Sequence, residues 1–389
     1  MVTQRSRAGC RAVHRATFHG LAVLSLAFAS TSAWSDTLGG DDKFVVSNPA
    51  IPSFNAISMD IAQNGDIYLA VQIDDPTEGP RIRVYRSKDG GDSWALWGTL
   101  SESDGLSSTG YSQPSLHVAE GTQNRCYLAC RSVGFVTGTD IVVAYSALNL
   151  ASASFTAVHA MSVNAVDFGR PKLTSDAIET SGYRLMLVAE GDDGNGTDVW
   201  FARSTTFGAT WDAQYEIGSV SGTTLDYSQP NIAYGTGGFI HCSWTLLTTV
   251  AGQDNAVRYR RASNYASAGL ADWAGIVGIT TTLDGVEDVG ARVAAAHTGG
   301  TVVVNYRGAN NGVVYVSTST NSGASWTAQP SLGSLGGFGI MAYPAAGPHG
   351  FAMLGLSIDQ VVLSSNRYIN AAPGTPKDTT TVLPRTIVP

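Results

Sequence analysis

The chain has 389 residues, a formal net charge of −8 and only 14% charged residues. An acidic chain without a basic cluster beyond its first residues is a poor ligand for nucleic acid, so we do not expect a nucleic-acid partner. Forty-four glycines and almost no helical periodicity favour an all-β chain that is rich in turns.

Residues 1–35 have the layout of a secretory signal peptide. Several arginines precede the apolar run Gly20-Leu-Ala-Val-Leu-Ser-Leu-Ala-Phe-Ala29, and small residues follow around Ala33. The run is too short to span a bilayer, and no transmembrane segment is predicted after it. We therefore expect a secreted or periplasmic protein whose signal peptide is removed near residues 33–35.

A turn motif recurs along the rest of the chain. The segments 87–94, 204–211 and 319–326 share the frame Ser-x-x-x-Gly-x-Ser/Thr-Trp, and their tryptophans lie 117 and 115 residues apart. Weaker copies end at Phe155 and Trp273, so the period is about 58 residues. A fixed period of this size predicts a repeat architecture.

Each repeat is predicted to form four antiparallel strands. In the first repeat, the runs Ala56-Ile-Ser-Met-Asp-Ile and Asp66-Ile-Tyr-Leu-Ala-Val are separated by Asn64-Gly65, which is a hairpin signal. A third run, Ile82-Arg-Val-Tyr, precedes the motif, which then forms the turn into the fourth strand. Four-stranded sheets that repeat around an axis make a β-propeller.

The openings of the repeats give the number of blades. Six first strands are expected to open at residues 54, 111, 168, 227, 289 and 338, which predicts a six-bladed all-β propeller over residues 36–369. The last repeat lacks a fourth strand, and the run Lys43-Phe-Val-Val-Ser is expected to supply it and so close the ring. Residues 370–389 are expected to be a tail or linker.

Three cysteines remain after the signal. Cys126 and Cys130 are four residues apart on one predicted strand, too far for a disulfide between them. Free buried thiols are favoured, and a bridge from Cys242 to either of them stays open.

The motif at 87–94 resembles the Asp-box of the sialidase (neuraminidase) superfamily, and the resemblance extends over most of the mature chain at the level of the fold. Two copies depart from it, with Thr206 and Asn321 in place of Asp89. Asp-boxes also occur in propellers that are not sialidases, so the resemblance implies a fold and not an activity. It implies a structural role for Ser87, Asp89, Gly91, Trp94, Ser204, Gly208, Trp211, Ser319, Gly323 and Trp326.

Sialidases of this superfamily open the first blade with Phe/Tyr-Arg-Ile-Pro, whose arginine helps to bind the substrate carboxylate. Here Asn55 stands in that place, and in the third repeat Arg170 is one position late, where strand alternation predicts the opposite face. Asp288 and Arg307 resemble the superfamily's Glu/Arg pair, and Tyr343 its tyrosine. The resemblance thus gives Asp288, Arg307 and Tyr343 as catalytic candidates without a complete sialidase site.

Polar and aromatic residues recur where first strands begin and second strands end. Such groups around the mouth of a propeller can bind a sugar, and equally they can tie neighbouring blades together. The candidate ligand-binding residues are Tyr111, Gln113, Arg131, Asp167, Arg170, Glu190, Asp226, Tyr227, Gln229 and Arg292. The spacing of the histidines does not predict a metal site, and no cofactor is expected.

Two classes of function follow from these patterns. The first is a secreted propeller directed at glycans, either as a binding protein or as a diverged glycoside hydrolase. The second is a non-catalytic scaffold of the cell envelope or extracellular space. We favour glycan recognition by a monomer.

Overall fold

The computed structural model describes residues 54–381 with gaps in the loops, the longest at 329–339 and 366–377. Side chains at 54–57, at 288–289 and from residue 340 onward are also outside the described part. The predicted signal peptide and the run at 43–47 therefore lie outside the described residues. No helix in the described part is long and apolar enough to cross a membrane.

The described strands form six four-stranded antiparallel sheets, numbered here in chain order. Sheets 1 to 3 consist of β1 (Phe54–Ile61), β2 (Ile67–Asp75), β3 (Gly79–Ser87) and β4 (Ala95–Leu100); β5 (Tyr111–Ala119), β6 (Arg125–Val133), β7 (Thr139–Ala147) and β8 (Thr156–Met161); and β9 (Asp167–Ser175), β10 (Leu185–Asp192), β11 (Thr197–Ser204) and β12 (Tyr215–Gly218). Sheets 4 to 6 consist of β13 (Leu225–Gly235), β14 (Phe239–Thr248), β15 (Ala256–Ala262) and β16 (Val277–Gly278); β17 (Asp288–Ala295), β18 (Val302–Gly308), β19 (Val314–Ser319) and β20 (Thr327–Ala328); and β21 (Ile340–Gly347), β22 (Gly350–Leu356), β23 (Val361–Ser365) and β24 (Asp378–Thr381).

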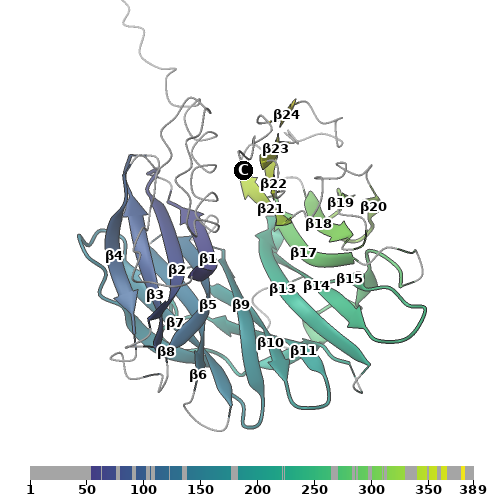
Figure 1. Cartoon of the computed structure of the whole chain (residues 1–389), viewed down its shortest axis with the longest axis horizontal. Helices are drawn as coiled ribbons and strands as arrows, with labels where there is room; N and C mark the ends of the chain where they lie inside the picture. The colour runs from purple at the N-terminus through teal and green to yellow at the C-terminus, as the bar shows by residue number, and fades with distance from the viewer. Residues whose placement is uncertain are drawn as a thin grey trace, which may run out of the picture.

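The sheets follow one another about a common centre, from β1–β4 to β21–β24 (Figure 1). The first strand of each sheet packs against the first strand of the next, so β1, β5, β9, β13, β17 and β21 are the inner strands. This is a propeller-like arrangement. The first strands begin within two residues of the predicted openings, because the repeat period and the turn residues are local signals.

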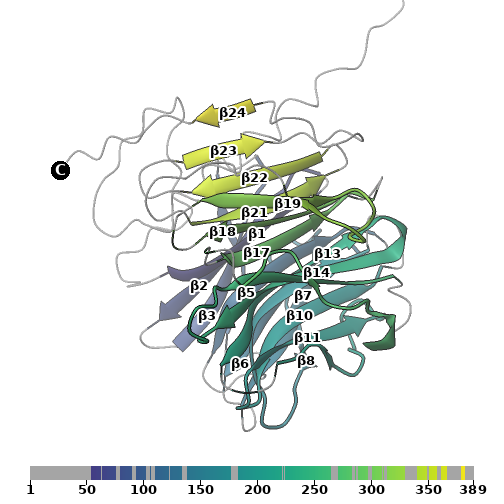
Figure 2. The same ribbon diagram turned by 90° about the vertical axis from the view of Figure 1, so that its right-hand side faces the viewer.

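The sixth sheet differs from the prediction. Its fourth position, beside β23, is filled by β24 from the C-terminal segment, at the outer edge in Figure 2. The sequence assigned that position to residues 43–47, so the predicted closure by a strand from the N-terminal segment is not confirmed.

Apolar clusters fill the junctions between neighbouring sheets. The aromatic residue that ends a turn motif packs against the preceding sheet: Phe155 on Trp97, Trp273 on Phe201 and Trp326 on Tyr259, with ring centroids 4.7–5.9 Å apart. Edge-to-face pairs of this kind add about 0.5–1.5 kcal/mol each beyond the burial of apolar area. The repeated motif therefore stabilises the contacts between sheets as well as the turn itself.

The motif turns have the predicted geometry wherever they are described. Ser204 Oγ accepts the N–H of Gly208, and Ser319 Oγ accepts the N–H of Gly323, at 2.9 and 2.8 Å. Both glycines have positive φ, 83° and 77°. In the first copy Asp89 accepts the Ser87 hydroxyl and the Ser93 N–H, each at 2.8 Å; Gly91 lies outside the described residues. The strand register places these turns at the end of the sheets opposite to the first-strand openings.

The three cysteines at 126, 130 and 242 are free and buried. Of the two alternatives that the sequence left open, the free thiols are confirmed.

Candidate functional site

Every inner strand is interrupted near its start by a shift in register against the second strand of its sheet. In sheets 2 to 5, the first residue of the interruption has positive φ: Gln113 (55°), Arg170 (45°), Gln229 (55°) and Gly290 (70°). Three of these are not glycine, which is uncommon and is held only by surrounding contacts. Such bulges redirect side chains, so simple strand alternation does not hold here.

The bulges are fixed by side chains from the preceding sheet. At the junction of sheets 1 and 2, Gln72 Oε1 accepts the N–H of Gln113 at 2.9 Å. At the junction of sheets 3 and 4, Glu190 Oε1 accepts the N–H of Gln229. At the junction of sheets 4 and 5, Thr245 Oγ1 accepts the N–H of Gly290 at 3.1 Å. A residue near the end of a second strand thus holds the bulge of the next inner strand.

Arginine stands at the corresponding place in sheets 2 and 5. Arg131 lies opposite Ser112, as Glu190 lies opposite Gly169, and Arg307 lies opposite Val289. An arginine has no acceptor, and at the junction of sheets 2 and 3 Gln113 Oε1 accepts the Arg170 N–H instead, at 2.6 Å. Within the described part, the Nε atoms of Arg131 and Arg307 are buried without a hydrogen-bond partner.

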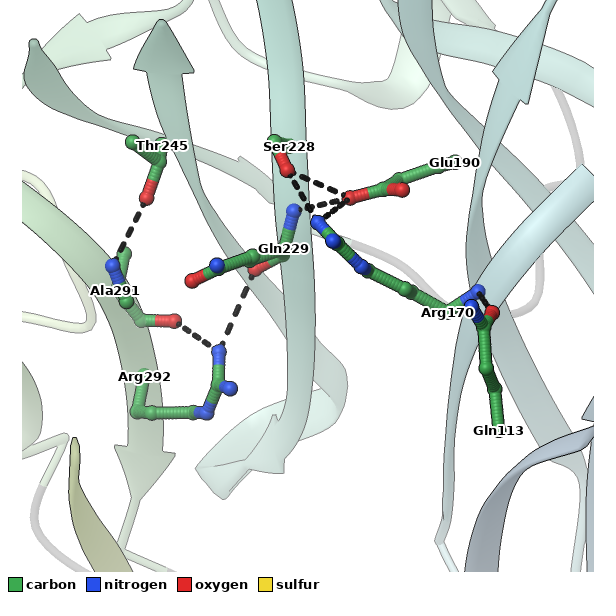
Figure 3. A network of polar contacts seen from close by, with 9 residues as sticks. Gln113, Arg170, Glu190, Ser228, Gln229, Thr245, Ala291 and Arg292 are labelled. Atoms are coloured by element: carbon green, nitrogen blue, oxygen red, sulfur yellow. Dashed lines mark hydrogen bonds and ion pairs between the residues drawn. The ribbon is translucent and has the colours of Figure 1, made fainter. Parts of the chain in front are cut away.

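Arg170 is the centre of a polar group that joins sheets 3 and 4 (Figure 3). Its Nη1 donates to Glu190 Oε1 at 3.1 Å and to Ser228 Oγ at 2.7 Å, and the Ser228 hydroxyl donates to the same carboxylate oxygen at 2.8 Å. The Arg170 side chain is 48% exposed and that of Glu190 only 14%. Strand alternation predicted that Arg170 points to the other face from the position of the superfamily's arginine, but the bulge at Arg170 interrupts that alternation, and its guanidinium lies on Glu190.

The two tyrosines of the predicted site lie in the apolar core. Tyr111 is fully buried in the cluster between sheets 1 and 2, and Tyr227 is 8% exposed and packs on Trp244. Their rings therefore contribute packing, and in this structure they are not on the surface where a ligand would bind.

The two described aspartates of the site hold neighbouring sheets together. Asp167 Oδ1 accepts the N–H of Thr139, and Asp226 Oδ1 accepts the N–H of Thr197, both at 2.9 Å. Each bond joins the start of an inner strand to the third strand of the preceding sheet. The side chains of Asp288 and Tyr343 lie outside the described residues, so their place in a site stays a prediction.

Arg292 is buried beside Gln229. Its Nη1 donates to the carbonyl oxygen of Ala291 at 2.9 Å and lies 3.5 Å from that of Gln229, at the junction of sheets 4 and 5 (Figure 3). Among the described residues, Gln229 Oε1 is buried without a hydrogen-bond partner.

Sequence reasoning missed Lys172 and Gln72. Lys172 follows the bulge of β9, is partly accessible to water, and forms no ion pair with the described residues. Burial, and next the charge of Arg292, lower its pKa to about 7. A lysine in an inner strand among apolar residues was the one signal in the sequence that could have identified it.

No group of three or more potential metal ligands occurs in the described part of the chain. The hairpin between β10 and β11 resembles a calcium loop in composition, but Asp192 and Asp193 accept the N–H groups of Gly194 and Asn195 within the loop. These bonds are those of a turn.

No protein-family model and no curated protein sequence matches the chain. Solved structures match it in fold. The α-L-arabinanase of Penicillium chrysogenum, complexed with arabinobiose, is 16% identical, covers 80% of this chain and 92% of its own, and superposes with a TM-score of 0.54. The α-L-arabinofuranosidase of Fusarium graminearum, in complex with an iminosugar inhibitor, is 15% identical over 78% of this chain and 88% of its own, with a TM-score of 0.55.

At this identity the likeness shows a shared fold. The chain has the fold of propeller-like glycoside hydrolases. The resemblance to sialidases is supported in this coarser sense only, since no family model matches.

Proposed function

We propose that the chain is a secreted six-bladed propeller that binds a glycan where the inner strands begin. The observation that carries the proposal is the group formed by Arg170, Glu190 and Ser228, in which a half-exposed guanidinium is held over a largely buried carboxylate. Only Nη1 of Arg170 and Oε1 of Glu190 take part in these bonds. The remaining donors and the second carboxylate oxygen are suited to the hydroxyl groups of a sugar.

Binding is proposed ahead of hydrolysis because glycosidases generally need two carboxyl groups across the scissile bond. Glu190 would be one. Asp226 and Asp288 are the candidates for the other, and Asp226 already uses one oxygen to hold Thr197. A diverged hydrolase is therefore the second form of the same proposal, and a scaffold propeller is the alternative if no glycan binds.

The test is a glycan array of the purified mature protein, followed by calorimetry on the glycans retained, starting with arabino-oligosaccharides. Arg170→Ala should weaken binding at least tenfold, since a charge-assisted hydrogen bond contributes about 1.5–3 kcal/mol. Lys88→Gln, an exposed charge in the turn at the opposite end of sheet 1, is the control and should bind as the parent does. The proposal fails if no glycan is retained, or if Arg170→Ala binds unchanged.

Hydrolysis is tested separately with fluorogenic arabinofuranosides and sialosides. Turnover of an arabinofuranoside that is lost in Glu190→Gln would establish the hydrolase form. We expect no turnover of a sialoside, because Asn55 stands where the superfamily has its first-blade arginine.

A further inference from the structure

Three polar side chains lie in a row across the inner strands of sheets 1 to 3. Asp60 is in β1, His117 in β5 and Ser175 in β9, each near the end of its strand and about one repeat period from the next. The inner strands end where the motif turns lie. The row is therefore at the end of the propeller opposite to the strand openings.

The imidazole of His117 contacts both of the other side chains. Its Nδ1 lies 3.2 Å from Asp60 Oδ2, and its Nε2 lies 2.7 Å from Ser175 Oγ. A carboxylate only accepts hydrogen bonds, so the proton of the neutral imidazole belongs on Nδ1, and Nε2 accepts the Ser175 hydroxyl. In this arrangement the imidazole can take the proton of the hydroxyl, as in the Ser-His-Asp triads of unrelated folds.

The carboxylate of Asp60 is fixed in place by the backbone. Its Oδ1 accepts the N–H of Ile61 and its Oδ2 the N–H of Val118, each at 2.8 Å. These bonds hold the carboxylate against the imidazole. The side chains of Asp60 and His117 are 34% and 18% exposed, and Ser175 is 7% exposed. Such limited access to the hydroxyl suits a small acyl group.

The contact between His117 and Ser175 differs from the bonds that hold neighbouring sheets together. Ser115 Oγ, on the same strand as His117, accepts the N–H of Leu173 at 3.3 Å and so joins a side chain to the backbone of the next inner strand. The bond between His117 and Ser175 joins two side chains and uses no backbone group. Its loss would leave the bond from Ser115 in place.

We propose that Asp60, His117 and Ser175 form a second catalytic site, which hydrolyses esters of small acyl groups such as acetate. Ser175 is the nucleophile and His117 the general base, while Asp60 positions the imidazole and stabilises its charged form. The site lies apart from the proposed glycan site, and the inference does not rest on glycan binding.

The reaction has two steps. Ser175 Oγ attacks the acyl carbon while its proton passes to His117 Nε2; the bond from that carbon to the alcohol oxygen then breaks, and the proton moves to the departing oxygen. Water attacks the acyl-serine and gives a proton to Nε2, which returns it to Ser175 Oγ as the carboxylic acid leaves. Ester and water thus give alcohol and acid.

The experiment uses p-nitrophenyl acetate as substrate and a fluorophosphonate, which forms a bond to an activated serine as fluoride leaves. We expect mass spectrometry to find the label on Ser175. Ser175→Ala and His117→Gln should each lower kcat at least hundredfold and abolish labelling. Ser115→Ala removes a hydroxyl from the neighbouring inner strand and is the control, which should be labelled as the parent is.

Asp60→Asn tests the positioning residue. The asparagine keeps an oxygen for the backbone N–H groups but no longer favours the proton on Nδ1, so kcat should fall at least tenfold while KM and the midpoint of thermal unfolding stay unchanged. A purely structural role of Asp60 would lower the midpoint and leave kcat of the folded protein as in the parent.

A second variant covers the case in which Ser175→Ala does not fold. Ser175→Cys keeps the size of the side chain, and the three native cysteines at 126, 130 and 242 are buried. Iodoacetamide should therefore alkylate the new thiol, at least tenfold more slowly when His117→Gln is added, because the imidazole draws off the thiol proton.

Turnover that persists in Ser175→Ala, the absence of both turnover and labelling in the parent, or a new thiol that reacts equally with and without His117 would each overturn the inference. The glycan array decides the proposed function separately, and Ser175→Ala should leave glycan binding unchanged.

Discussion

Gln113 Oε1 accepts the N–H of Arg170 from the neighbouring inner strand at 2.6 Å, whereas Gln229 Oε1 is buried and has no hydrogen-bond partner in the described part of the chain. Both residues occupy the same bulge position and both have a φ of 55°. Replacing each of the two residues in turn therefore separates the contribution of the hydrogen bond to stability from the contribution of the backbone conformation.

We expect Gln113→Ala to lower the free energy of unfolding by about 1–3 kcal/mol, because it leaves the Arg170 N–H without its acceptor. Gln229→Ala carries the same change in backbone preference and removes an oxygen that has no partner, so it should cost much less. Urea unfolding of the two variants measures the difference. Equal losses would mean that the Gln113 bond contributes nothing beyond the strain at the bulge.

A second comparison concerns the glycines with positive φ. A Cβ atom on Gly323 (φ 77°) would lie 1.8 Å from the hydroxyl oxygen of Tyr259, whereas one on Gly194 (φ 88°) would meet nothing within 4 Å. Gly194→Ala should cost about 1–2 kcal/mol from the backbone conformation alone. Gly323→Ala should cost clearly more, because Tyr259 packs on Trp326 and cannot move away freely. Thermal unfolding of both variants tests this, and similar losses would contradict it.

The sequence predicted where the inner strands begin but not the bulges that orient the side chains of the candidate site, for one physical reason. Turn residues and the repeat period are local, so the openings at Phe54 and Tyr111 were placed correctly. The bulges at Gln113, Arg170 and Gln229 depend on acceptors from neighbouring sheets, and no pattern within a single strand indicates them.

The orientation of the tyrosines at the predicted strand openings also depends on contacts between sheets, which a pattern within one strand does not indicate. Tyr111 and Tyr227 have the composition of a sugar-binding platform, but whether a ring at the start of a strand faces the core or the ligand depends on packing between sheets. Arg131 was selected for its charge, yet only the structure shows that its Nε is buried without a hydrogen-bond partner among the described residues.

The buried imidazole of His241 should make the free energy of unfolding depend on pH in the acidic range. Its ring is 1% exposed and its Nδ1 lies 2.6 Å from the Tyr259 hydroxyl, and burial, then the charge of Arg261, lowers its pKa to about 3. The unfolded chain takes up this proton near pH 6.5. The contribution of neutral His241 to stability is therefore complete above pH 6.5 and is lost progressively as the pH falls towards 3.

Between pH 6.5 and 4.5 the parent should lose roughly 2 kcal/mol more than His241→Gln, which cannot take up the proton. Asp198, whose pKa burial raises to about 6, acts in the opposite direction but equally in both proteins. Urea midpoints at pH 7, 5.5 and 4.5 give the comparison. Parallel pH profiles would show that the imidazole is charged in the folded protein.

Lys172 makes stability change in the same direction as His241, but over a higher range of pH. Burial and the charge of Arg292 lower its pKa from 10.5 to about 7, so between these values the unfolded chain holds the proton more tightly than the folded one. The unfavourable burial of the charge is complete below pH 7 and is relieved as the pH rises to 10.5, so this group makes stability increase with pH over that range.

Lys172→Met should be more stable than the parent at pH 6, and the advantage should shrink by pH 9.5. Lys88→Met, at an exposed position, is the control and should show no such trend. Should Lys172→Met prove less stable than the parent at every pH, the ammonium group is held by a favourable contact and the lysine is structural.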